Sequence, residues 1–200
     1  MNRDGIAEPR SSGDAPAAPA PGEIHVWRIV VGDTEGRARA RAALGAILAG
    51  YLGGAEPRLR SDGNGKPGLA TDPGRLSFNL SHSGGLALVA IAPGDVELGV
   101  DVERLRPRRD LARLAERWLP EADAATVAAP PESGREATFY AAWTRHEARV
   151  KCTGVGLAGP APGPEVSAWP IEIDAGYAAA VALATSAEPR IVLRAWPCRR

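Results

Sequence analysis

The chain has 200 residues, of which 24 are basic and 24 acidic, and its formal net charge is +0. A protein that coats nucleic acid needs a broad basic surface, so this balance argues against that class of function. No apolar run reaches the roughly 18 residues of a membrane-spanning helix, and the N-terminal residues lack the apolar stretch of a secretory signal, so we expect a cytoplasmic protein that does not bind membranes.

The first predicted elements are a tail, a strand and a helix. Residues 1–22 are rich in Ala, Pro, Gly and Ser without periodicity, which is typical of a disordered tail. Apolar and β-branched residues from Glu23 to Val31 predict a strand. Apolar residues then recur at helical spacing over about 35–52, with Thr34 as the expected N-cap and the pair Gly53-Gly54 as the expected end.

The rest of the chain is predicted to contain strands, then helices, then strands again. After a glycine-rich loop, the expected elements are strands over 76–80, 86–92 and 98–103, a helix capped by Asp110 and ending at Trp118, a short helix after Pro120, a long helix over 134–153, and three strands within 165–195. Because strands and helices do not alternate one by one, the pattern indicates an α+β fold.

Two carboxylates lie on one predicted strand. Asp101 and Glu103 are two residues apart, so both point to the same face, while Leu98, Val100 and Val102 occupy the other face. Carboxylates this close repel each other unless a cation lies between them, and oxygen ligands on a rigid strand suit Mg²⁺. Taken alone, these residues are also compatible with a solvated polar face.

The long predicted helix carries a second set of polar residues. Trp143, Glu147 and Lys151 are spaced four residues apart and lie on one stripe, with His146 beside it. By itself, this spacing is also that of a surface ion pair between Glu147 and Lys151, worth only about 0.3–0.5 kcal/mol.

Two further segments offer groups that suit phosphate oxygens. FNLSHSGG brings Asn79, Ser81, His82 and Ser83 to a strand end, where hydroxyls, an imidazole and backbone N–H groups can cradle a phosphate. A turn with local hydrogen bonds is the alternative. GKPGL presents Lys66 on a loop stiffened by proline, although it lacks the spacing of a Walker A motif.

These segments follow one another in an order that is more specific than any one of them. GKPGL precedes FNLSHS, then GVDVE, then W-T-x-x-E-A-x-x-K-x-x-G-x-G-L. The set resembles the 4′-phosphopantetheinyl transferases of the Sfp type, which activate carrier proteins of fatty-acid, polyketide and nonribosomal-peptide synthesis. The resemblance spans about residues 37–183 and implies two similar α+β subdomains, over 23–102 and 103–200, with the active site in the cleft between them.

The resemblance also implies roles for individual residues. Asp101, Glu103 and Glu147 are the expected Mg²⁺ ligands, with the ion on the diphosphate of coenzyme A. Lys151 is expected to stabilise charge as 3′,5′-ADP leaves, and Glu147 is also the candidate base for the carrier serine. His146 departs from the family, which commonly has lysine at that position.

The expected contacts to the phosphates of coenzyme A come from Arg41, Lys66, Ser81 and His82. A guanidinium such as that of Arg41 suits a phosphate monoester, here the 3′-phosphate.

The implied partner is an apo acyl or peptidyl carrier protein, with a monomeric enzyme and no nucleic acid. Arg104, Arg106, Arg108 and Arg109 form a candidate basic patch for an acidic carrier helix, although a solvated loop explains them equally. Two alternative functions stay open at this stage. One is a metal-dependent hydrolase that cleaves the diphosphate of coenzyme A with water, and the other is an inactive coenzyme A or carrier binder.

Overall fold

The structure is a computed structural model that describes residues 16–61, 63, 65–71, 74–156, 159 and 162–197. In chain order its elements are β1 (Glu23–Val30), α1 (Gly36–Tyr51), β2 (Leu59–Ser61), β3 (Pro67–Leu69), β4 (Leu76–Ser83), β5 (Leu86–Pro93), β6 (Leu98–Arg104), α2 (Leu111–Trp118), α3 (Glu121–Ala128), α4 (Glu132–Thr153), β7 (Ser167–Pro170), β8 (Tyr177–Leu183) and β9 (Arg190–Ala195). The predicted α+β fold is confirmed.

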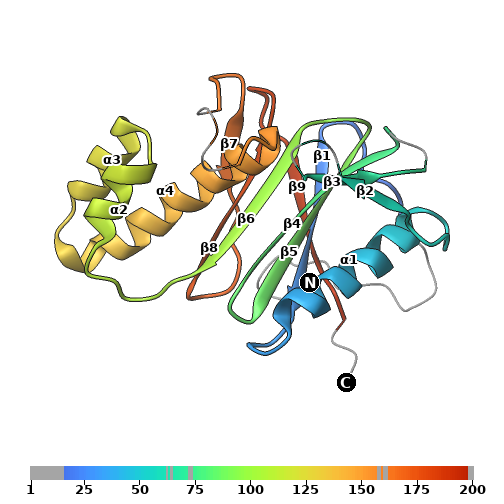
Figure 1. The fold of residues 1–200 in the computed structure, drawn as a ribbon, viewed down its shortest axis with the longest axis horizontal. Coiled ribbons are helices and arrows are strands. Elements are labelled where there is room, and N and C mark those ends of the chain that lie inside the picture. The colour runs from blue at the N-terminus through green and yellow to red at the C-terminus, as the bar shows by residue number, and fades with distance from the viewer. Residues whose placement is uncertain are drawn as a thin grey trace.

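The strands form two main sheets, each covered by one long helix (Figure 1). The first sheet has the order β4-β5-β1-β9 and carries α1, and the second has the order β6-β8-β7 and carries α4. β2 and β3 make a separate antiparallel ribbon. The last strand, β9, leaves the second half of the chain and pairs in parallel with β1, so the two halves are tied together at the N-terminal sheet.

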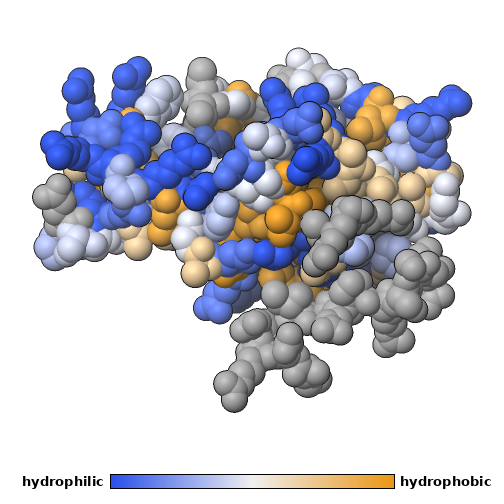
Figure 2. Space-filling model, turned by 90° about the horizontal axis from the view of Figure 1, so that it is seen from below, coloured by the Kyte–Doolittle hydropathy of each residue, from blue (hydrophilic) through white to orange (hydrophobic). Residues whose placement is uncertain are grey.

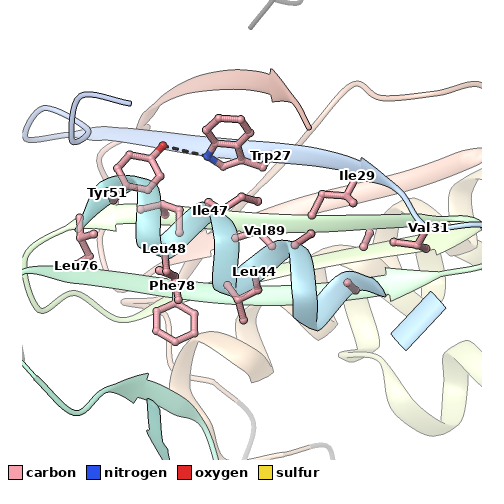
Figure 3. Packing of buried hydrophobic residues seen from close by; sticks show 14 of the residues in the cluster. Trp27, Ile29, Val31, Leu44, Ile47, Leu48, Tyr51, Leu76, Phe78 and Val89 are labelled. Atoms are coloured by element: carbon pink, nitrogen blue, oxygen red, sulfur yellow. Dashed lines mark hydrogen bonds between the residues drawn. The ribbon is translucent and has the colours of Figure 1, made fainter. Parts of the chain in front are cut away.

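The N-terminal core forms where α1 packs on the first sheet. Leu44, Ile47 and Leu48 follow helical spacing and point from α1 toward the strands, as Figure 3 shows. Burial of one such side chain stabilises the fold by about 1.5–3 kcal/mol. At the end of α1, the Tyr51 hydroxyl accepts a hydrogen bond from Trp27 Nε1 at 3.0 Å, which anchors the helix to β1.

The second core brings α4 unusually close to its sheet. A Cβ added at Gly99 on β6 would lie 2.0 Å from the carbonyl oxygen of Ala148 and 2.5 Å from the amide nitrogen of Cys152. Small buried residues of β8, Ala180 and Ala182, line the same contact. The backbone of α4 can therefore rest directly on β6, which determines how near its side chains come to those of that strand.

Several predictions of detail are wrong. The residue before α1 is Glu35, which has a left-handed conformation (φ 58°) and makes no side-chain cap, so Thr34 is not the N-cap. Asp110 occupies the N-cap position of α2, and the helix ends at Trp118, both as predicted, but the Asp110 carboxylate binds Arg108 at 3.0 and 3.1 Å and makes no capping bond. The glycine-rich segment SDGNGKPGL, expected to be a loop, contains the short strand β3 and the last residue of β2, with which β3 pairs.

The predicted domain limits are not tested by these sheets. Residue 102 lies inside β6, and β9 belongs to the first sheet, so hydrogen bonding does not divide the chain at one point. The limits 23–102 and 103–200 stay a prediction. Most of the predicted tail, residues 1–15, lies outside the described residues, while residues 16–20 carry neither helix nor strand.

Polar and apolar residues are unevenly distributed over the face of the molecule seen from below. Seen from below, hydrophilic residues cover much of the end of the molecule where α2 and α3 lie, and apolar residues reach the surface nearer the middle (Figure 2). None of the described helices combines the length and the apolar character that crossing a bilayer would require.

Candidate active site

The candidate site is built on β6, whose two faces differ. Leu98, Val100 and Val102 point into the core between the sheets, so Asp101 and Glu103 point to the opposite side, toward α4, as the alternation predicts. Asp101 is only 2% exposed, and burial raises the pKa of its carboxyl while the ammonium of Lys151 opposes that shift.

Lys151 and Ser81 meet Asp101 from two other elements. The Lys151 Nζ on α4 donates to Asp101 Oδ1 at 2.6 Å and to Ser81 Oγ at 2.9 Å. Ser81, on β4, donates from Oγ to the same Asp101 oxygen at 2.8 Å. Three residues that are far apart in the sequence thus share one hydrogen-bonded cluster. Ser81, predicted to contact phosphate, is buried and directs its hydroxyl into this cluster.

Glu147 lies one helical turn before Lys151, and the negative charges of the other two carboxylates act on it. Burial, together with the negative charges of Asp101 and Glu103, raises the pKa of Glu147 to about 7, against the opposing charge of Lys151. Burial likewise raises the pKa of Glu103. A carboxyl with a pKa near neutrality is suited to accepting a proton from a substrate hydroxyl.

The three carboxylates do not form a closed ligand set. Within the described ranges, no three His, Cys, Asp or Glu side chains stand together closely enough to hold a metal ion. Their assignment as ligands therefore stays a prediction. Two observations nevertheless fit a hard cation there: Asp101 Oδ2 is buried without a hydrogen-bond partner, and the negative charges repel one another. A divalent ion would satisfy both, because carboxylate oxygens are its preferred ligands.

A pocket between the two halves adjoins this cluster. It has a volume of about 330 Å³, and its wall includes Lys66 and Asn79 from the first half and Glu147 and Lys151 from the second. Lys66 Nζ donates to the carbonyl oxygen of Cys152 at 2.5 Å, in the last turn of α4, where a cation complements the helix dipole. Lys66 thus connects its loop to the helix that carries Lys151.

The remaining predicted phosphate contacts lie in a positively charged corner. The exposed His82 is the last residue but one of β4 and lies near Gly36, the first residue of α1. Desolvation lowers the pKa of His82, and the nearby charges of Arg37, Lys151 and Arg41 lower it further. The charges of residues on α1 and α4 therefore both act on the imidazole of His82. The positive charges of Arg37, Arg41 and Lys151, gathered in this way, favour a bound anion.

His146 lies away from the pocket that holds Glu147 and Lys151. It is half-buried and lines a different pocket with Asp123 and Arg149, and burial, followed by the charge of Arg149, lowers its pKa. The imidazole is therefore not among the cationic groups of the site.

The basic segment after β6 borders a separate aromatic pocket. Arg104, Arg106 and Arg108 line it together with Trp118 and Trp143, next to Glu103, and its volume is about 330 Å³. Arg104 is also paired with Asp33 at 3.2 Å.

The sequence predicted Ser83 only as part of a phosphate cradle, whereas its hydroxyl donates to Glu103 Oε2 at 2.7 Å. A signal was present: Asn79, Ser81 and Ser83 alternate along β4, so their side chains share the face that carries Ser81. What the sequence lacks is any indication that β6 lies beside that face.

Comparison with known proteins identifies relatives of one kind. The family model described as the 4′-phosphopantetheinyl transferase superfamily matches residues 97–191. The chain is 33% identical over 169 residues to the 4′-phosphopantetheinyl transferase HetI of a Nostoc species, covering 68% of this chain and 70% of that protein. It is 37% identical over 99 residues to the 4′-phosphopantetheinyl transferase psf-1 of Bacillus pumilus, covering 50% of this chain and 40% of the relative. With AcpT of Escherichia coli K12 it shares 34% identity over 121 residues, or 60% of each chain.

Proposed function

Because the chain belongs to the 4′-phosphopantetheinyl transferase superfamily, we propose that it transfers the 4′-phosphopantetheine group of coenzyme A to a serine of an apo acyl or peptidyl carrier protein. The names of the relatives support the transferase reaction. The order of the four sequence segments, together with two sheets in a single chain, supports an enzyme of the Sfp type.

One observation carries this proposal: Lys151 is hydrogen-bonded to Asp101 and lines one pocket with Glu147, near a positively charged corner. The carboxylates and Lys151 come from β6 and α4, and the corner comes from α1 and β4. A diphosphate needs cations along its oxygens, and a serine nucleophile needs a base near the phosphorus. The cations near His82 support the first role, and the raised pKa of Glu147 supports the second.

In the proposed reaction, different side chains of this protein bind coenzyme A, accept the proton and stabilise the leaving group. Arg41, Lys66 and His82 would bind phosphate oxygens of coenzyme A and orient the diphosphate. As the serine Oγ of the carrier attacks phosphorus, Glu147 would accept the hydroxyl proton, directly or through water. The bond between phosphorus and the oxygen of 3′,5′-ADP breaks, and the Lys151 ammonium would stabilise the negative charge on that leaving group.

The donor set also fits Mg²⁺. Asp101, Glu103 and Glu147 would hold the ion, with the unpartnered Oδ2 of Asp101 as one ligand atom. When bound, Mg²⁺ supplies positive charge that offsets the charge of the diphosphate during its cleavage.

The test is to incubate the full chain with coenzyme A, Mg²⁺ and a panel of apo carrier proteins, and to read each carrier by intact mass. We expect one phosphopantetheine group to be added to at least one carrier, and Glu147→Gln and Asp101→Ala to abolish the addition in folded protein. Glu136→Gln, earlier on the same helix, is the matched control and should retain the wild-type rate.

Two outcomes would contradict the proposal. Cleavage of coenzyme A at an equal rate without any carrier would identify a hydrolase. Substantial transfer by folded Glu147→Gln or Asp101→Ala protein would remove the proposed site, whichever carrier is modified.

A further inference from the structure

Strands β4 and β6 are connected by hydrogen bonds between the backbone of β6 and polar side chains of β4. The backbone N–H of Val100 donates to Asn79 Oδ1 at 3.0 Å, that of Val102 to Ser81 Oγ at 3.4 Å, and that of Arg104 to Ser83 Oγ at 3.1 Å. Both strands advance by two residues from one bond to the next, so they run parallel. We call these three bonds the side-chain ladder.

The two serines of the ladder also contact the carboxylates that alternate with its N–H groups. Ser81 donates to Asp101 at 2.8 Å and Ser83 to Glu103 at 2.7 Å. Each hydroxyl therefore accepts from the backbone of β6 and donates to a carboxylate of the same strand. A hydroxyl has one donor hydrogen and two acceptor lone pairs, so both bonds are compatible.

The end of the ladder at Ser83 is held in place by the next residues. A Cβ at Gly84 would lie 2.7 Å from Arg104 Cδ and 3.1 Å from the Tyr177 hydroxyl, so the turn after β4 packs directly on β6 and β8. The backbone N–H of Gly85 donates to the same Tyr177 hydroxyl at 3.2 Å. The turn that directly follows Ser83 is thus fixed against Arg104 and Tyr177.

We propose that Ser83 is a positioning residue, which through one hydroxyl fixes the backbone of β6 at Arg104 and the carboxylate of Glu103. Asp101 is additionally held by Lys151, whereas Glu103 is only partly buried and depends on Ser83 for its orientation. The inference rests on the proposed function, in which Glu103 helps to hold a divalent cation beside coenzyme A.

The test compares Ser83→Ala, Ser83→Thr and Ser83→Val with the wild type. Thr keeps the hydroxyl, and Val has nearly the same shape without it. The control is Ser77→Ala. Ser77 lies on the same face of β4 and accepts from the Val96 N–H at 3.0 Å, but its hydroxyl donates to the carbonyl oxygen of Gly94 instead of to a carboxylate. Binding of Mn²⁺ in the presence of coenzyme A is measured from the free ion by electron paramagnetic resonance, and thermal melting checks that each variant is folded.

Hydrogen-bond partners of metal ligands typically contribute about 10- to 100-fold to metal affinity, so we expect Ser83→Ala and Ser83→Val to weaken Mn²⁺ binding by about tenfold. Ser83→Thr and Ser77→Ala should bind Mn²⁺ like the wild type. Amide hydrogen exchange at Arg104 should accelerate in the Ala and Val variants and not in the Thr variant.

The failures are distinguishable. If the wild type binds Mn²⁺ and Ser83→Ala and Ser83→Val bind it equally well, the positioning role is overturned while the proposed function stands. If Thr weakens binding as much as Val does, the hydroxyl is not the cause and the inference also fails. If the wild type neither binds Mn²⁺ nor modifies any carrier, the proposed function is overturned, and this inference with it.

Discussion

Gly99→Ala tests the contact that brings α4 onto β6. The added Cβ would lie 2.0 Å from the carbonyl oxygen of Ala148 and 2.5 Å from the amide nitrogen of Cys152, two atoms that are partners in one helical hydrogen bond. Even a close C–H···O contact keeps carbon and oxygen about 3.3 Å apart. Because the obstacle is backbone, no side-chain rotation relieves the overlap, and α4 must retreat from the sheet by about 1 Å or more.

That movement has consequences for stability and for catalysis. Overpacking of a well-packed core costs about 1–3 kcal/mol, so we expect the free energy of unfolding in urea to fall by that amount. Glu147 and Lys151 lie on the part of α4 that moves. A displacement of about 1 Å can cost about 10²-fold in rate, so carrier modification should slow by about 100-fold.

Gly45→Ala is the matched control, since a Cβ on this residue of α1 meets nothing within 4 Å. It should leave the transfer rate unchanged and stabilise the helix by about 1 kcal/mol or less. Wild-type stability and rate in Gly99→Ala protein would refute the account of how α4 packs on β6.

Two further predictions concern other parts of the molecule. The pKa of Glu147 is raised from 4.5 to about 7, so between these pH values the unfolded chain has lost a proton that the folded chain retains. The free energy of unfolding in cation-free buffer should therefore decrease as pH rises through this interval. Glu147→Gln should flatten this decrease in urea melts at several pH values, and an unchanged slope would contradict the assignment. Tyr51→Phe removes the hydroxyl that binds Trp27 Nε1 at 3.0 Å and His25 Nδ1 at 2.6 Å. Because the substitution leaves these buried polar groups unpaired, it should lower the free energy of unfolding by about 1–3 kcal/mol without changing the transfer rate. A loss below about 0.5 kcal/mol would show that the hydroxyl is dispensable.

Helices such as α1 and α4 were predictable because residues close together in the sequence determine where they form and end. The helical spacing of Leu44, Ile47 and Leu48 locates α1, and Gly154, in the left-handed conformation with φ 73°, ends α4 where a C-cap was expected. The pairing of β9 with β1 was not predictable, since Arg190 and Glu23 are 167 residues apart and nothing in either strand specifies the partner.

The alternation of side chains along β6 was predictable, but the contacts that these side chains make were not. Alternation along β6 correctly predicts that Asp101 and Glu103 share a face opposite Val100 and Val102. The pairing of Lys151 with Asp101 and the role of Ser83 depend on the parallel approach of β4 and β6 and on the absence of a side chain at Gly99. These are properties of the packed molecule, which periodicity in the sequence does not encode.

The central claim is that the carboxylates of β6 and α4 hold one divalent cation against the diphosphate of coenzyme A. Anomalous diffraction from crystals grown with coenzyme A and Mn²⁺ tests this claim most directly. The account predicts a single strong peak bound by oxygens of Asp101, Glu103 and Glu147 and by the diphosphate. A peak elsewhere, or coenzyme A bound with these three side chains directed away from its phosphates, would contradict it.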